Sequence, residues 1–453
     1  MRLMQNKFTT IIFIIAITLR LLFLLLIPNI PNGVLGDDPG NEYNIIAGNI
    51  IDGKGFSLEP NIPTPSRAPF YPVFLSIIYA IFGYKYIIVR LIQCVVDSFT
   101  CVIIFFIAKN IFETTIIKTV VADLSAQKTA DKSATTILKS DNNIIIPVLA
   151  ALAVAMYPPF IMYANSLFSE TLYSFLLAVF FLLFVVGINK NNYIYYIFAG
   201  VFMGLANLCR PITLLYPFLA ILISLLIYKK KQTVIGCLIM LLASIIIIMP
   251  WTIRNQIQFK RFVPVTVRSG YNFWAGNYIP WDGYWLSWKT RDANLEKQAV
   301  EITNQIIKKA DEKLTDVSSK SRHGVVMIDS DELFFQEGIK NIIQNPSGSL
   351  KLFIKKIYRF LFYPIGAGFL QERGHNLLFA VFVGVQWLII GFAGYGFYRG
   401  FSEAKISIFF LVLIIYFTVS HSFLLVIPRY HLPIMPYILI FAIYGIRKLV
   451  FMK

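Results

Sequence analysis

The run FTTIIFIIAITLRLLFLLLI, Phe8–Ile27, is predominantly apolar and ends where a long polar segment begins. A helix that crosses the hydrocarbon core of a bilayer needs about 20 such residues, so we expect this run to span a membrane. It is too long for the apolar region of a signal peptide, and no small-residue cleavage site follows it. Because Arg2 and Lys7 precede the run, its start is expected in the cytoplasm and its end outside.

Composition extends this interpretation to the whole chain. Of the 453 residues, 57% are hydrophobic and 14% are charged. These proportions exclude an ordinary soluble domain and are typical of a protein with many spans. The formal net charge of +17 is explained by basic residues at cytoplasmic helix ends, and no basic-aromatic module indicates nucleic acid. The four cysteines lie in apolar runs and are interpreted as core residues.

We therefore predict an all-α polytopic membrane protein with about ten to thirteen transmembrane helices. The short run Ala68–Phe82 is expected to stay at the outer face, because a full crossing would place the lysine-containing loop Lys109–Asn143 outside. The later spans are predicted at Ile87–Ala108, Ile144–Tyr163, Leu167–Val186, Tyr193–Cys209, Ile212–Tyr228, Thr233–Met249, Leu377–Tyr398, Ile406–Ile427 and Leu432–Ile446.

Three parts follow from this pattern. Residues 1–250 are expected to form a transmembrane catalytic core with an active-site loop at 28–86. Residues 251–358 form an extracytoplasmic subdomain, and residues 359–453 form the C-terminal transmembrane helices. Within the subdomain, helical spacing predicts helices at Ala293–Leu314 and Asp331–Gln344, and Lys351–Phe362 is predicted to lie on the membrane surface. Its tryptophans suit sugar stacking: Trp274, Trp281, Trp285 and Trp288.

The loop after the first span holds the most distinctive residues. It reads NIPNGVLGDDPGNEYNIIAGNIIDGKGFSLEPNIPTPSRAPFY, Asn29–Tyr71, and carries Asp37, Asp38, Glu42 and Arg67. Carboxylates can activate a hydroxyl group by removing its proton, and a guanidinium can hold an anion. The local alternative for the aspartate pair is a polar turn before Pro39-Gly40. The loop is thus the predicted active site.

Further charged residues at span ends come out on the same side of the membrane. Arginine is expected to be depleted there, so its presence beside carboxylates indicates an anionic substrate at the bilayer surface. For Glu170 the alternative is a first-turn acid favoured by the helix dipole, and for the arginines it is contact with lipid headgroups. The outer-face set contains Asp37, Asp38, Glu42, Arg67, Glu170, Arg210, Arg254 and Arg429.

Short motifs in a fixed order resemble those of a known family. They are the acidic loop with Tyr43 and Gly53-Lys54-Gly55-Phe56, then Arg67-Ala68-Pro69-Phe70-Tyr71-Pro72, Ser169-Glu170, Arg210-Pro211, Pro250-Trp251-Thr252-Ile253-Arg254-Asn255, and Arg429-Tyr430 with Leu432-Pro433 and Pro436. In this order they resemble the polyprenyl-phosphate-sugar-dependent glycosyltransferases with the C-type membrane fold. That group includes protein O-mannosyltransferases and lipid A aminoarabinose transferases.

The resemblance implies an inverting glycosyltransferase at the outer face of the cytoplasmic membrane. Asp38 or Asp37 is then the catalytic base, and Glu170 orients the acceptor or shares that role. Donor phosphate is expected at Arg67, Arg210, Arg254 and Arg429, and the substrate at Glu42, Tyr43, Tyr71 and Tyr430. The partners are a polyprenyl-phosphate sugar, a lipid, polysaccharide or protein acceptor, and membrane lipids.

No cofactor is required by these residues, and a divalent metal ion stays open. Ser66-Arg67 replaces the Glu-Lys pair of the aminoarabinose enzymes, so a structural metal bound through that glutamate is not expected. Two other functions also stay open. A flippase or transporter of polyprenyl-linked glycans would carry charges along a path inside the bundle, whereas here they concentrate at one face. An O-antigen ligase or polymerase also uses outer arginines, but would not be expected to carry the acidic pair.

Overall fold

The computed structural model describes residues 2–26, 41–126, 144–283, 293–314, 318–365 and 375–450. Helices dominate these residues, and the only sheet among them is a two-stranded antiparallel hairpin, β1 (Ser57–Glu59) with β2 (Ile62–Pro63). The all-α polytopic prediction is confirmed. The described chain has seven helical stretches long and apolar enough to cross a membrane, or eight if one bent pair is one span.

The apolar helices lie at the predicted positions. Fewer than the predicted ten are long enough, among the described residues, to cross a membrane as one helix. The bent pair is α6 (Ile145–Met156) and α7 (Pro158–Ala164), which meet at 57°. The bend falls at Pro158, which has no backbone N–H to continue the α6 hydrogen-bond ladder. Two further apolar helices, α9 (Tyr193–Cys209) and α19 (Ser407–Phe423), have 17 residues each. The remaining apolar helices are α1 (Arg2–Leu26), α4 (Tyr86–Ala126), α8 (Glu170–Lys190), α10 (Tyr216–Ile223) with the π-helix η2 (Ser224–Tyr228), α11 (Lys231–Phe259), α18 (Asn376–Glu403) and α20 (Met435–Val450).

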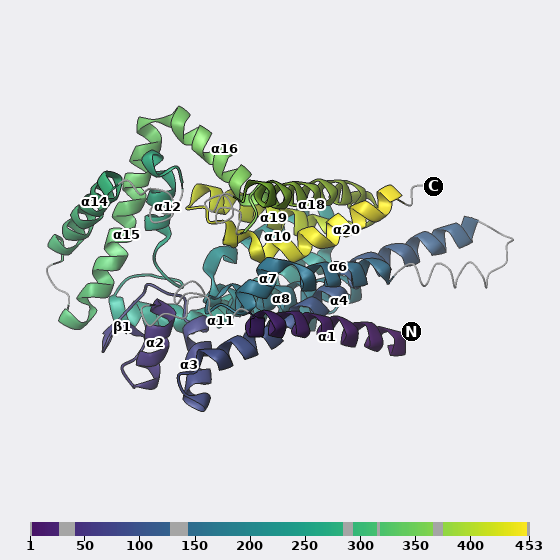
Figure 1. Ribbon diagram of the computed structural model, residues 1–453, viewed down its shortest axis with the longest axis horizontal. Coiled ribbons are helices and arrows are strands. Elements are labelled where there is room, and N and C mark those ends of the chain that lie inside the picture. The colour runs from purple at the N-terminus through teal and green to yellow at the C-terminus, as the bar shows by residue number, and fades with distance from the viewer. Residues whose placement is uncertain are drawn as a thin grey trace.

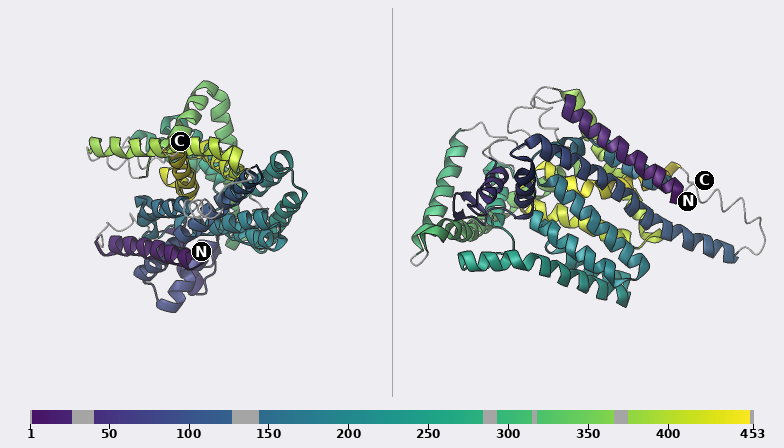
Figure 2. Two further views of the ribbon diagram at one scale, coloured as in Figure 1. Left: turned by 90° about the vertical axis from the view of Figure 1, so that its right-hand side faces the viewer. Right: turned by 90° about the horizontal axis from the view of Figure 1, so that it is seen from below.

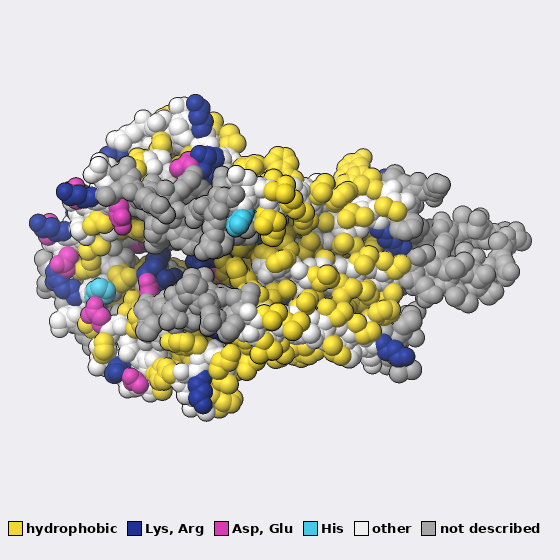
Figure 3. Space-filling view, in the orientation of Figure 1, with side chains coloured by type: hydrophobic (Ala, Val, Ile, Leu, Met, Phe, Trp, Pro, Cys, Tyr) yellow, Lys and Arg dark blue, Asp and Glu magenta, His cyan; other side chains and the backbone are white. Residues whose placement is uncertain are grey.

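The apolar helices run side by side as a bundle (Figures 1 and 2). The start of α1 and the end of α20 lie at the same end of this bundle, as expected if both are on one membrane side. Close backbone approach holds neighbouring helices together: a Cβ on Gly396 would lie 1.9 Å from the carbonyl oxygen of Phe441, so α18 and α20 could not pack this way with a larger residue. Figure 3 shows hydrophobic side chains covering the bundle surface, with charged side chains gathered at its ends.

The other end of the bundle carries a helical module formed by α12 (Ser269–Asn277), the 3₁₀ helix η3 (Ile279–Trp281), α14 (Ala293–Glu312), α15 (Ser319–Gln344) and α16 (Pro346–Phe362). Trp274 and Trp281 are 0% and 3% exposed and pack with Phe334 in the module core. The sugar-stacking prediction is therefore wrong for both. Trp285 and Trp288 lie outside the described residues.

One buried lysine joins this module to the bundle. Lys356 of α16 is fully buried, and its Nζ donates to the carbonyl oxygens of Gly276 (2.8 Å) and Leu424 (3.1 Å). These oxygens belong to the carboxyl ends of α12 and α19, where helix dipoles favour a cation. Burial lowers the pKa of Lys356 to about 7. The module is thus held against the bundle through polar contacts as well as through packing.

Two predicted boundaries are corrected. The predicted loop Lys109–Asn143 begins as helix, because α4 continues to Ala126 through residues that include no glycine or proline. The predicted outer segment does not begin at Pro250, since α11 continues through it to Phe259. Side-chain amide bonds from Asn255 to the carbonyl oxygen of Val263 (3.0 Å) hold that extension in place.

The described part of the active-site loop is also structured. It contains α2 (Glu42–Ile51), whose N-cap Asn41 accepts a hydrogen bond from the Tyr43 N–H, followed by the β1–β2 hairpin. Gly53 and Gly55 have φ of 71° and 80°, as a turn requires, and no helix that could hold a phosphate follows them directly. The predicted surface run Ala68–Phe82 forms the short helix α3 (Phe70–Phe82).

One feature inside the bundle departs from the expectation that the charged residues concentrate at one face. Arg20 of α1 and Asp97 of α4 are 0% and 1% exposed and form an ion pair at 2.5 Å. Arg20 also donates to the carbonyl oxygen of Ala155 (3.2 Å), and its own carbonyl accepts from Asn165 (3.3 Å). The pair therefore joins α1, α4 and the bent α6–α7 segment. Since charge inside a membrane is costly, such a pair needs close partners of this kind.

Candidate active site

Glu170 is the centre of one cluster of charged side chains. It is the first residue of α8 and is 2% exposed. Its Oε1 lies 2.7 Å from Nη1 of Arg210 and 3.4 Å from Nε of Arg429. Arg210 follows the last residue of α9, and Arg429 lies in the 3₁₀ helix η4 (Pro428–Ile434). These three residues, called the Glu170 cluster below, come from segments far apart in the sequence and were all predicted as site residues.

Glu42 forms a second cluster, called the Glu42 cluster below. Its Oε2 lies 2.8 Å from Nε of Arg67, and its Oε1 lies 2.5 Å from Nη2 of Arg268. The three side chains are 26%, 29% and 33% exposed, so they are far more accessible than Glu170. Burial alone would raise the pKa of Glu42, but attraction by Arg67 and Arg268 outweighs it and lowers that pKa below its ordinary value.

Two tyrosines pack against the arginines of these clusters. The Arg67 guanidinium lies over the Tyr43 ring at 5.0 Å, and the Tyr43 hydroxyl is 3.4 Å from Oγ of Ser169. The Arg210 guanidinium lies over the Tyr430 ring at 5.0 Å and also donates to Ser169. The structure therefore brings Glu42, Tyr43, Arg67, Glu170, Arg210, Arg429 and Tyr430 together at one place.

Tyr71 is a buried residue that packs against Tyr43 and supports the two clusters. It is fully buried, packs edge-on against Tyr43 with ring centroids 5.0 Å apart, and donates its hydroxyl to Gln93 (2.9 Å). Gln93 in turn donates to the carbonyl oxygen of Ser166 (2.6 Å), in the segment that leads into Glu170. Tyr71 thus has a supporting position, and it is not on an open surface for substrate.

Arg254 forms no ion pair with the carboxylate of either cluster, and it donates to the carbonyl oxygen of Thr64. Its guanidinium packs on the rings of Trp251, Phe259 and Phe56, at 4.7, 5.3 and 5.7 Å, and donates to the carbonyl of Phe56. Among the described residues it forms no ion pair with a carboxylate. These contacts tie the end of α11 to the turn before β1, so Arg254 is placed as a structural residue in this arrangement.

Asp37 and Asp38, the predicted bases, lie outside the described residues. The described side chains include no group of three or more His, Cys, Asp or Glu that could hold a metal ion. The four cysteines are buried and free.

Sequence reasoning missed Arg268, Gln93 and the Arg20–Asp97 pair. Gln93 and Asp97 lie in the apolar run Ile87–Ala108, which was predicted only as a membrane span. Arg268 precedes α12 in a segment of mixed composition, with no local pattern that separates it from its neighbours. A positive φ of 134° sets it apart in the structure, and only the folded chain shows that conformation.

Counted over the two clusters, four guanidinium groups face two carboxylates, which leaves an excess of positive charge. Such a place favours an anion, because arginine presents several N–H donors in a planar fork that matches carboxylate and phosphate oxygens. Tyrosine rings between the arginines add flat apolar surface and a hydroxyl group, features that also suit a sugar.

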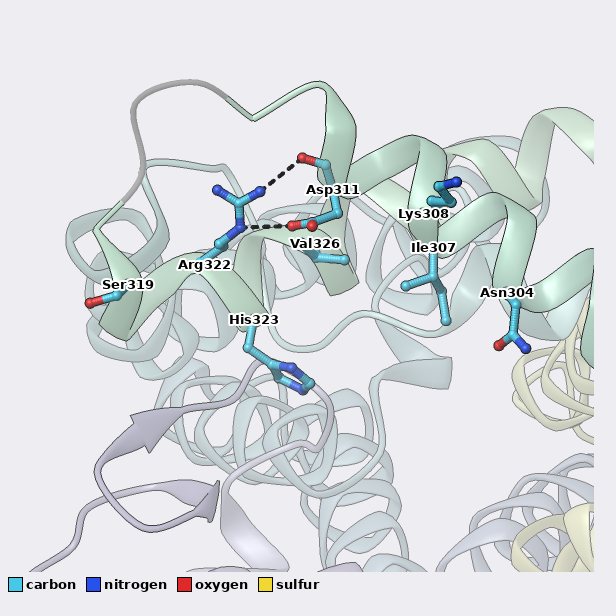
Figure 4. Close-up of a pocket in the computed structure, with 8 residues that line it drawn as sticks. All are labelled: Asn304, Ile307, Lys308, Asp311, Ser319, Arg322, His323 and Val326. Carbon is cyan, nitrogen blue, oxygen red and sulfur yellow. Dashed lines mark hydrogen bonds and ion pairs between the residues drawn. The ribbon is translucent and has the colours of Figure 1, made fainter.

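A separate cavity of about 480 Å³ lies in the module, between α14 and α15 (Figure 4). At its rim, Nε of Arg322 lies 2.8 Å from Oδ1 of Asp311. None of the predicted site residues lines it. Its lining residues are Asn304, Ile307, Lys308, Asp311, Ser319, Arg322, His323 and Val326.

Fold and site together define an all-α polytopic membrane protein with two neighbouring clusters in which arginines outnumber carboxylates. No family model matches the chain, and no curated protein matches it. Among solved structures it is similar to the oligosaccharyltransferase of Archaeoglobus fulgidus, crystallised with a tethered acceptor peptide that contains an NVT sequon. The TM-score is 0.52 at 13% identity, over 98% of this chain and 49% of that one.

The chain thus spans about half the length of that structure, and the likeness concerns the fold. At 13% identity this likeness shows a shared fold and carries no activity over to this chain.

Proposed function

We propose that the chain is a membrane glycosyltransferase that moves a sugar from a polyprenyl-phosphate donor to an acceptor hydroxyl. The observation that carries this proposal is the convergence of Arg210 and Arg429 on Glu170 within this fold. The site lies at the extracytoplasmic face of the cytoplasmic membrane, where the polyprenyl tail lies in the bilayer beside the apolar helices.

In the proposed reaction, the acceptor oxygen attacks the anomeric carbon from the face opposite the phosphate. The bond from that carbon to the phosphate oxygen breaks, its electron pair stays on the departing polyprenyl phosphate, and the configuration inverts. Asp38 or Asp37 takes the acceptor proton. Negative charge grows on the phosphate as the bond breaks, and Arg210 and Arg429 stabilise it there.

Glu170 fixes both arginines in this arrangement. A guanidinium held by a buried carboxylate keeps its remaining N–H donors in place before the substrate arrives, and such preorganisation avoids reordering during the reaction. Tyr43 and Tyr430 lie beside these arginines and are the proposed contacts for the sugar. Glu42 and Arg67 lie on the far side of Tyr43, toward the module.

Transport of a lipid-linked glycan is the second candidate, and the buried Arg20–Asp97 pair is the observation that favours it. Charged groups inside a bundle often mark a transport path. Here, however, both side chains are closed off from solvent and hold α1 against α4.

One experiment separates the two functions. The purified chain is reconstituted in vesicles with a radiolabelled polyprenyl-phosphate sugar in one leaflet. Release or transfer of the labelled sugar supports the transferase. Movement of intact donor to the other leaflet supports transport and contradicts our proposal. Arg210→Gln should abolish release, whereas Arg261→Gln, which removes the bidentate Arg261–Asp329 pair (3.0 Å for each contact), should not.

A further inference from the structure

We propose that the Glu42 cluster is a second anion-binding site, separate from the Glu170 cluster, and that it receives an oxyanion carried by the acceptor. The acceptor role rests on the proposed function. The ligand class is a phosphate or carboxylate group, whether on a lipid headgroup or on a soluble molecule.

The first observation is the convergence of two guanidinium groups on one position. Arg67 and Arg268 contact different oxygens of the same Glu42 carboxylate, at 2.8 and 2.5 Å. A carboxylate bridged in this way shows that the two arginines are spaced to hold one oxyanion. Each uses one nitrogen in these contacts, and a guanidinium carries five N–H donors. Among the described residues, no other hydrogen bond from Arg67 or Arg268 is made.

The second observation is the backbone of Arg268. A φ of 134° is a costly conformation for a residue with a side chain, and such outliers persist where the surroundings enforce them. Two anchors enforce it. Before Arg268, the Val267 N–H donates to the carbonyl oxygen of Pro65 (3.1 Å). After it, the N–H groups of Gly270 and Tyr271 both donate to the Asp331 carboxylate at 2.9 Å.

The second anchor also leaves no space around Gly270. A Cβ on Gly270 would lie 1.7 Å from the carbonyl oxygen of Asp331, so the start of α12 is pressed directly against α15. The chain therefore holds Arg268 in a strained backbone conformation, and in this conformation its guanidinium contacts Glu42. The energetic cost points to a use for the guanidinium there.

The third observation is the location of each cluster. Glu170 is 2% exposed at the start of a membrane helix, where a membrane-bound phosphate would arrive. The Glu42 cluster is 26–33% exposed and includes Arg268, which begins the module. Tyr43 lies between the two. An anion at the Glu42 cluster therefore reaches the site from the module side and is not the donor phosphate.

The test is protection of each arginine from phenylglyoxal, read by peptide mass spectrometry on the full chain in phosphatidylcholine nanodiscs. Three probes are added separately: inorganic phosphate, phosphatidate in the nanodisc, and polyprenyl phosphate. We expect inorganic phosphate or phosphatidate to protect Arg67 and Arg268, whereas polyprenyl phosphate protects Arg210 and Arg429 and leaves Arg67 and Arg268 reactive. Protection by phosphatidate alone identifies a lipid source, and protection by inorganic phosphate identifies a free oxyanion.

Two variants sharpen the result. Glu42→Gln removes the competing carboxylate, so the phosphate concentration for half-protection of Arg67 and Arg268 should fall several-fold. Arg268→Gly should abolish protection of Arg67, and Arg261 should remain unprotected throughout. The proposal is overturned if neither phosphate nor phosphatidate protects Arg67 and Arg268 in wild type or Glu42→Gln, or if polyprenyl phosphate protects all four arginines. Absence of polyprenyl-phosphate protection at Arg210 and Arg429 contradicts the proposed donor site instead.

Discussion

Arg268 contacts Glu42 at 2.5 Å across a sequence separation of 226 positions, and it does so from a backbone conformation that favours glycine. The contact joins the start of the module to the first helix after the membrane anchor. It is therefore part of the fold and, in our proposal, part of a binding site. Stability and binding can be separated by substituting each partner in turn.

Arg268→Gly should be more stable than Arg268→Ala. Both variants lose the ion pair with Glu42, but only glycine adopts a positive φ without a steric penalty. The difference is expected at about 1–3 kcal/mol, the usual cost of a strained residue. Thermal unfolding of the two purified variants in the same detergent measures it. Equal midpoints would mean that the local backbone relaxes and that no strain is stored at this position.

The Glu42 ion pairs should make stability depend on acid pH. Because the folded-state pKa of Glu42 is lowered, its contribution is present above the unfolded pKa of about 4.3 and is lost as pH falls through the folded value. Wild type should therefore lose more stability than Glu42→Gln as pH falls from about 5 to below the folded-state pKa of Glu42. Unfolding midpoints across this window give the answer, and parallel curves for both proteins would contradict the assignment.

Arg210→Gln should weaken binding of polyprenyl phosphate. A hydrogen bond to a charged group contributes about 1.5–3 kcal/mol, so the dissociation constant should rise roughly 10- to 100-fold. Arg254→Gln is the comparison, because the Arg254 guanidinium packs on aromatic rings and, among the described residues, forms no ion pair with Glu42 or Glu170. Affinity measured by titration in nanodiscs should be unchanged in that variant. Equal losses in both would argue against a specific phosphate contact at Arg210.

Asp37→Asn and Asp38→Asn should have unequal effects on turnover. Each removes a proton acceptor while keeping the side-chain shape, and loss of a general base costs about 10²–10⁴ in rate. We expect Asp38 to be the base, with donor affinity nearly intact in its variant. Turnover of a labelled donor gives kcat for both variants. Full activity in both would leave the pair as a polar turn and remove the proposed proton acceptor.

Gln93→Leu should destabilise the packing beneath the candidate site, although Gln93 belongs to neither cluster. The substitution removes the bonds to the Tyr71 hydroxyl and to the Ser166 carbonyl, and a buried polar group left unpaired costs about 1–3 kcal/mol. Tyr71→Phe removes only the first bond and should cost less. Ser98→Ala is the control, since within the described residues the Ser98 hydroxyl bonds only to the Cys94 carbonyl oxygen of its own helix. We expect the unfolding midpoint to be highest for Ser98→Ala, lower for Tyr71→Phe and lowest for Gln93→Leu.

The sequence by itself determined the class of fold and the positions of the spans. Burial in a bilayer requires a long apolar helix, and that property is local, so Phe8–Ile27 and Leu167–Val186 could be recognised without knowing their neighbours. The same locality explains the errors. Whether the helix ends at Pro250 or continues to Phe259 depends on tertiary contacts such as Asn255 with Val263, and the local amino-acid pattern does not reveal those contacts.

Site residues divide in the same way. Glu170, Arg210 and Arg429 could be selected because a charge at the end of an apolar run is unusual and costly, which is visible in one dimension. Their convergence, the packing of Arg254 on aromatic rings, the support from Gln93 and the contact of Arg268 with Glu42 were decided by the tertiary structure. Ion pairs form between side chains that the fold brings within a few ångströms, and chain separation places no limit on which of them meet.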